Sequence, residues 1–174
     1  CLVLIPSGVS AQSYATLWKD VDAAKKQDLP RKQMTLIRKI ADKARAEKNH
    51  GQLLEAELRH AAVLLELTPD SLLPVVAQFE REAVEAEKED KVLAAVYNSV
   101  LGKIYKQNRK LGEDHETVAR GYYRKSLANP GLLAAQTVDN LGSLVEKGED
   151  SRFFGNNLLS MLCMEADDYE TLCN

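Results

Sequence analysis

Apolar side chains recur every three or four residues along almost the whole chain, and this spacing is the feature that most limits its fold. A repeat of about 3.6 residues gives a helix one apolar face, whereas a half-buried strand needs alternation with period two. No stretch alternates convincingly with that period. A chain of 174 residues is long enough to bury one helical core or a short stack of helical hairpins. The sequence therefore predicts an all-α protein of antiparallel helical hairpins.

Capping residues and short polar loops divide this pattern into about eight helices. Asn49 can cap one helix, with Gln52 reaching back as its capping-box partner. Thr68 followed by Pro69 marks another start, and Pro74 either kinks that helix or delays its true beginning. We expect helices at about residues 14–26, 31–48, 50–67, 69 to the acidic stretch at 87–90, 92–111, 117–128, 130 to Gly148, and a last one capped by Asp150 or Ser151.

One pair of predicted helices carries part of the tetratricopeptide repeat signature. The string LGKIY at residues 101–105 is followed by Ala119, Tyr123 and then Pro130, in the order of that repeat. Gly102 would let the paired helix approach closely, because it has no side chain. The intervening loop is longer than the standard unit, and the other pairs lack this element. We therefore expect a tetratricopeptide-like right-handed solenoid, with a globular helical bundle as the alternative.

The composition excludes several classes of function. The formal net charge is −3, and lysine and arginine are spread between acidic residues, so the sequence predicts no coherent positive field and no binding of nucleic acid. No apolar stretch approaches the roughly 18 residues needed to span a bilayer, so we expect no transmembrane helix.

The first residues have the character of a secretory signal. The string CLVLIPSGVSAQ at residues 1–12 has no charge, and its apolar run ends in small residues at Val9 and Ala11. These are the positions that a signal peptidase inspects, so we interpret residues 1–11 as the remnant of a signal peptide that continues upstream. The mature chain, residues 12–174, would form one helical domain. The alternatives are a frayed apolar terminus and a lipidated Cys1 that holds the chain to a membrane.

The two remaining cysteines do not suggest a disulfide scaffold. Cys163 and Cys173 would lie about 15 Å apart in one continuous helix, beyond the reach of a disulfide. A bond would need a turn near Asp167 and Asp168. We favour the alternative, in which Cys163 is a small buried hydrophobic residue.

The sequence offers little on which to build an active site. The string ELRH at residues 57–60 is a Glu-x-x-His pair of the kind that di-iron bundles use, but it occurs once. The other histidines, His50 and His115, fall at predicted loops. We therefore expect His60 to lie on the surface among charges, and DHE at residues 114–116 to form a solvated loop. Glycine-rich phosphate loops and zinc motifs are missing, so we predict no enzyme, no cofactor and no bound metal.

Aromatic side chains are the candidate contact residues. Trp18 lies centrally on the apolar face of the first predicted helix. Tyr122 and Tyr123 are adjacent, as are Phe153 and Phe154, so one ring of each pair can enter the core while its neighbour lies on the surface. These rings serve either in packing or in a contact patch, because exposed aromatic residues often anchor interfaces.

Four strings resemble a known family: SYATLWKDVD at residues 13–22, KQDLP at 26–30, YYRKSLANP at 122–130 and GEDSRFFGNNLL at 148–159. They are similar to the amino-terminal helical region of large exported alpha-2-macroglobulin-like proteins of Bacteroidetes, and the likeness spans Ser13 to the end. None of them is a catalytic signature. The thioester pattern of that family, Cys-x-Glu-Gln, is approached only by CMEA at residues 163–166, which lacks the glutamine.

The resemblance implies a non-catalytic helical scaffold within a protease-trapping protein of the periplasm or cell surface of a Gram-negative bacterium. Its partners would be further domains of the same polypeptide, beyond Asn174, or another envelope protein. The bait region would lie in those further domains. The alternative is a free-standing tetratricopeptide-like adaptor that binds a peptide or protein in a concave groove.

We predict that export removes residues 1–11, because only there does an apolar run precede small residues at the peptidase positions. Mass spectrometry of the exported protein should find Gln12 as the first residue. A mass that includes a lipidated Cys1 would contradict this prediction.

Overall fold

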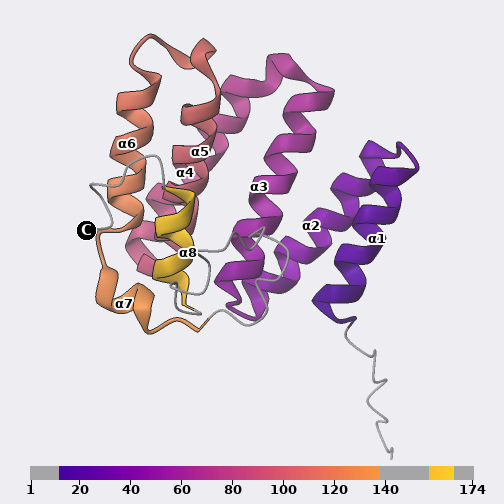
Figure 1. Ribbon diagram of the computed structural model, residues 1–174, viewed down its shortest axis with the longest axis horizontal. Coiled ribbons are helices and arrows are strands. Elements are labelled where there is room, and N and C mark those ends of the chain that lie inside the picture. The colour runs from indigo at the N-terminus through magenta and orange to yellow at the C-terminus, as the bar shows by residue number, and fades with distance from the viewer. Residues whose placement is uncertain (1–11, 138–156, 167–174) are drawn as a thin grey trace, which may run out of the picture.

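The computed structural model describes residues 12–137 and 157–166, and within them it is all-helical (Figure 1). The predicted fold class is thus confirmed. Thr137 and Asn157 form a single antiparallel bridge, and these two ranges contain no strand. The α-helices are α1 (Tyr14–Lys26), α2 (Pro30–Ala46), α3 (His50–Leu67), α4 (Leu72–Glu89), α5 (Lys91–Gln107), α6 (His115–Ser126), α7 (Pro130–Ala134) and α8 (Leu158–Glu165), and two 3-10 helices are η1 (Pro69–Ser71) and η2 (Arg109–Leu111).

Four helices begin at a residue whose side chain accepts a hydrogen bond from the first turn. Ser13 caps α1, Asn49 caps α3, Asp90 caps α5 and Asn157 caps α8, each from a backbone N–H two or three residues further on. Such a side chain satisfies a donor that has no partner inside the helix. The capping role predicted for Asn49 is confirmed.

Two other predictions about helix starts are wrong. Gln52 does not reach back to Asn49, because it lies buried between α1 and α3, where its Oε1 accepts a hydrogen bond from Nε1 of Trp18 at 2.6 Å. The Thr68 hydroxyl does not cap a helix either, since it donates to the carbonyl of Leu64 at 2.9 Å.

The proline in the fourth predicted helix delays its start and does not kink it. After η1, α4 begins at Leu72, so that Pro74 falls in the first turn. A missing N–H costs little there, because the first N–H groups of a helix have no partner within it.

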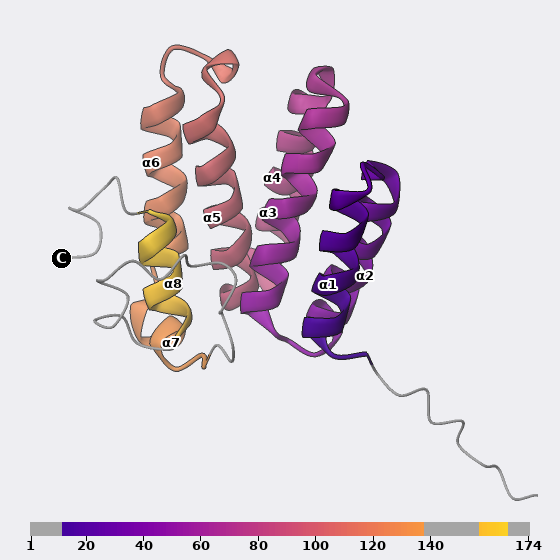
Figure 2. The ribbon, with the colours of Figure 1, turned by 45° about the vertical axis from the view of Figure 1, so that its right-hand side comes forward.

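Successive helices run in opposite directions from α1 to α6 (Figure 2). They pack side by side in two groups, α1 to α3 and α4 to α6, and α3 contacts the second group mainly through α5. Helix α2 packs between α1 and α3, and α5 packs against α3, α4, α6 and α8. The hairpin of α1 and α2 lies at one end of the stack and α6 at the other (Figure 1). This arrangement fits a stack of helical hairpins, and its right-handed solenoid twist stays a prediction.

The seventh helix is much shorter than predicted. It ends at Ala134, because the following backbone turns toward α8: the carbonyl of Gln136 accepts from the N–H of Leu158 at 3.0 Å, next to the bridge between Thr137 and Asn157. The described part of the last helix begins at Leu158.

Several predictions fall outside the described residues. They are the signal peptide remnant at 1–11, Gly148 as a helix end, Asp150 or Ser151 as a cap, Phe153 and Phe154 as contact residues, and Cys173. Cys163 lies partly buried on α8. Because Cys173 is outside the described residues, the expectation that the two do not pair stays a prediction. Among the described helices none has both the length and the apolarity to cross a membrane.

The close approach predicted at Gly102 is present between α5 and α6. A Cβ atom at Gly102 would lie 2.8 Å from Cδ1 of the Tyr123 ring, closer than two carbon atoms can pack. Tyr123 and Ala119 on α6 are fully buried at this contact. The repeat-like string thus corresponds to a helix pair whose spacing requires glycine.

We predict that Gly102→Ala lowers the free energy of unfolding by about 1–2 kcal/mol, since overpacking outweighs the helix-forming advantage of alanine. The matched control is Gly121→Ala on α6, where an added Cβ meets no atom within 4 Å. That variant should be more stable by up to about 1 kcal/mol. Urea denaturation measures both, and equal stabilisation by the two changes would contradict the proposed contact.

Candidate functional site: the groove between α4, α5 and α6

Trp18, one of the predicted contact residues, is a packing residue. It is 8% exposed, and besides its hydrogen bond to Gln52 it carries the Arg59 guanidinium 4.5 Å from the ring centroid. Arg59 in turn pairs with Asp22 of α1 at 3.4 Å and Glu55 of α3 at 2.7 Å. Trp18 therefore joins α1 to α3 and presents no free surface to a partner.

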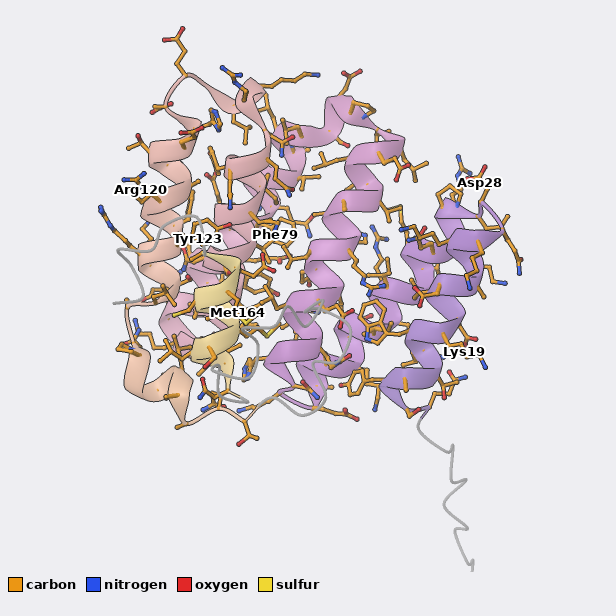
Figure 3. All side chains as sticks on the ribbon, in the orientation of Figure 1. Lys19, Asp28, Phe79, Arg120, Tyr123 and Met164 are labelled. Carbon is orange, nitrogen blue, oxygen red and sulfur yellow. The ribbon has the colours of Figure 1, made fainter. Side chains whose placement is uncertain are left out.

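The adjacent tyrosines of α6 divide between core and surface, as predicted for such a pair. Tyr123 points between α6 and α5, whereas Arg120 on the same helix points away from the stack (Figure 3). Tyr122 is only half-buried and lines a groove. Of the predicted contact aromatics within the described ranges, Tyr122 is thus the one available to a partner.

This groove has a volume of about 750 Å³. Its walls are α4 and α6, and its floor is α5, which contributes Ala95 and Asn98. Val84 of α4 is 59% exposed and lines the groove. Besides the aromatic Tyr122, the remaining lining residues have small, charged or amide side chains: Glu80, Ala83, Glu87, Lys88, Lys91, Lys125, Ala128 and Asn129.

One wall of the groove is held by a pair of stacked tyrosines. The rings of Tyr122 and Tyr105 lie 5.4 Å apart at 28°, and both hydroxyls donate to the same oxygen of Glu80, at 2.8 and 3.3 Å. Burial, and then the hydrogen bond to Glu80, raise the pKa of Tyr122. The phenol therefore stays protonated and keeps its bond to Glu80. Lys125 lies over the same ring, 5.1 Å from its centroid.

A second polar cluster joins α2, α3 and α5 through the half-exposed Arg45. Arg45 donates to Glu57 Oε1 and to the Tyr97 hydroxyl, both at 3.0 Å. Burial raises the pKa of Glu57 to about 7, and the nearby carboxylates of Glu82 and Asp42 add to this effect while Arg45 opposes it. Glu57 is therefore a buried acid that changes charge near neutral pH.

The histidines do not lie where the sequence predicted. His60 is 8% exposed, and its Nε2 accepts a hydrogen bond from Nε of Arg38 at 3.0 Å, so the expected surface position is wrong. Burial, and then the charge of Arg38, lower the pKa of His60. His115 begins α6, is buried, and places Nδ1 2.9 Å from the carbonyl of Tyr105, so it is no solvated loop residue. His50 begins α3.

The Glu-x-x-His pair therefore serves in helix packing. Glu57 accepts a hydrogen bond from Arg45, and His60 accepts one from Arg38. The two side chains that could act as metal ligands are thus bonded to arginines of α2. In the described ranges no three His, Cys, Asp or Glu side chains come together as metal ligands would.

Comparison with protein-family models, curated proteins and solved structures finds no match for this chain.

We predict that Glu57→Gln makes stability less dependent on pH. A carboxyl whose pKa is raised on folding stabilises the folded state below its unfolded pKa, and this contribution is lost as the pH rises through about 7. The free energy of unfolding of the variant, relative to that of the wild type, should therefore rise by up to a few kcal/mol between pH 5 and pH 8. This follows from about 1.4 kcal/mol per unit of pKa shift.

Urea denaturation at pH 5, 6, 7 and 8 measures this difference. The lowered pKa values of His50 and His60 affect wild type and variant alike, so their contributions cancel in the difference between the two free energies of unfolding. Glu85→Gln is the control, because Glu85 is an exposed partner of Lys88, and its profile should follow the wild type. A constant difference between wild type and Glu57→Gln would contradict the prediction.

Proposed function

We propose that the chain is a non-catalytic helical scaffold, which forms the amino-terminal interaction segment of an exported alpha-2-macroglobulin-like protease-trapping protein. The non-catalytic role is supported by one observation: side chains that could act in catalysis bond to neighbouring helices. Glu57, His60 and His115 each bond to another helix through Arg45, Arg38 and the Tyr105 carbonyl, respectively. The family and the location, in the periplasm or at the cell surface, rest on the resemblance of the four strings.

The groove between α4 and α6 supports a role in protein contact. Ala83, Val84, Ala95 and Ala128 offer small apolar surfaces that a partner side chain can cover. Tyr122 is already fixed by Glu80, so little conformational entropy is lost when it is covered. An apolar centre with a charged rim is the usual composition of a protein interface.

The alternative, a free-standing adaptor that binds a peptide between its hairpins, has less support. Helix α8 packs against both α3 and α5, and Lys103 of α5 pairs with Glu165 of α8 at 3.2 Å. The chain thus covers with its own helix part of a face that an adaptor would leave to a ligand.

We predict that the groove is covered when the chain is part of a longer polypeptide. Acetylation of Lys88, Lys91 and Lys125, which line the groove, should be several-fold slower in the exported full-length protein than in the isolated chain. Lys19 and Lys26, exposed on α1, are the internal controls. Quantitative mass spectrometry of the acetylated peptides gives the rates.

Three kinds of result would contradict the proposal. Equal rates for the groove and control lysines in both proteins would show that nothing covers the groove. A reading frame without macroglobulin-like β-sandwich domains after Asn174 would remove the family part, even if the groove is protected. The isolated chain should also neither hydrolyse peptide substrates nor inhibit proteases, and either activity would contradict the scaffold role.

A further inference from the structure

Helix α2 concentrates positive charge in a chain that is negative overall. It carries six basic residues and only one acidic residue, Asp42, while the whole chain has a formal net charge of −3. Residues 13–48, which contain α1 and α2, hold ten of the 23 basic residues but only five of the 26 acidic ones. The first hairpin is therefore the positive end of the stack.

The cations of α2 form two rows on its outer face. Arg31 and Arg38 are seven residues apart, as are Lys32 and Lys39, and all four are exposed. Seven residues are close to two helical turns, so each row runs along the axis with a spacing of about 10.5 Å. In this segment the basic residues are therefore not spread between acidic ones, and the helical repeat aligns them in rows.

These four cations have no carboxylate partner in the part of the chain that the structure describes. Lys39 donates to the neutral amide of Gln12 at 2.9 Å, and Arg38 donates to His60. By contrast, Lys43 on the same helix pairs with Glu47. The outer face of α2 thus keeps its charge, and Arg38 is held in place by a bond that leaves this charge uncompensated.

We propose that the outer face of α2 binds an acidic α-helix of a protein partner, whose carboxylates recur every seven residues. A helix packed alongside α2 repeats with the same period, so its acidic row would face Arg31 and Arg38 or Lys32 and Lys39 along its length. Arginine suits this contact because its guanidinium can hold a carboxylate through two parallel hydrogen bonds. The inference rests on the proposed scaffold function in that it takes the partner to be a protein.

The surface chemistry favours a protein partner over a lipid bilayer. A helix that lies in a membrane interface inserts an apolar face, whereas the apolar face of α2 is buried through Ile37, Ile40 and Ala44. None of the exposed large apolar side chains in the described ranges lies on α2. Only electrostatic attraction is therefore available at this face. Its cations stand in ordered rows, which match a partner whose carboxylates have fixed positions.

Two synthetic helical peptides of equal composition test the proposal with the intact chain. One carries glutamates every seven residues, and the other carries them scattered around the helix. Fluorescence anisotropy of the labelled peptides at low and physiological salt should show tighter binding of the first, weakened by salt. Replacing Lys32 and Lys39 together by Glu should weaken it by about tenfold or more, since two attractive contacts become repulsive.

The matched control replaces Lys19 and Lys26 by Glu, because these exposed residues of α1 have the same spacing and give the same change in net charge. Its affinity for the first peptide should stay within about twofold of the wild-type affinity, because salt screens most of the long-range effect of the change in net charge. Equal losses in both double variants, or equal affinity for both peptides, would overturn the inference. Two further results would overturn it. One is binding of the chain to vesicles of phosphatidylcholine and phosphatidylglycerol that is lost when Lys32 and Lys39 are replaced. The other is self-association, measured by sedimentation, that is lost in the same variant. All these outcomes are independent of the reading frame after Asn174, so they separate this inference from the proposed family.

Discussion

The packing of α5 is the constraint on which the rest of the structure depends. Eleven of its seventeen residues are buried, because α3, α4, α6 and α8 all lie against it. A buried polar side chain on such a helix is costly without a partner, and the Asn98 amide finds one by donating to the carbonyl of Ala94 at 2.8 Å. Where α6 comes closest, only Gly102 leaves room for the Tyr123 ring. The position of α6, and with it the groove, is thus set by a glycine on α5.

Arginines of α2 and of α3 itself explain how polar residues come to be buried in α3. Glu55, Glu57 and His60 would each be costly to bury alone, since an unpaired polar group loses its hydration. Each meets a guanidinium whose own side chain reaches solvent: Arg59 for Glu55, Arg45 for Glu57 and Arg38 for His60. The bonds from Arg45 to Glu57 and from Arg38 to His60 cross from α2 to α3, so they help to fix how these two helices lie against each other.

The same pairs mark the limit of what the sequence could predict. Apolar residues such as Leu17 and Val21 of α1, or Ile37 and Ile40 of α2, identify the buried faces by their spacing, so the helices were predicted well. The burial of Glu57 and His60 was not predicted, because it depends on arginines from another helix. Of the groove, only Tyr122 was proposed in advance. Its other walls come from residues more than thirty positions away, such as Glu80 and Val84, which no local pattern connects to α6.

The bridge between Thr137 and Asn157 has a consequence for how such a chain can change during evolution. Together with the hydrogen bond from Leu158 to Gln136, it holds the two ends of residues 138–156 beside each other at the base of α7 and α8. The entropy of closing a loop grows only with the logarithm of its length, by about 0.6 kcal/mol for each doubling. A change in the number of residues between Thr137 and Asn157 would therefore alter the entropy of bringing these two residues together only slightly. On this ground the length of the connection can vary in evolution while the bridge at the base of α7 and α8 is kept.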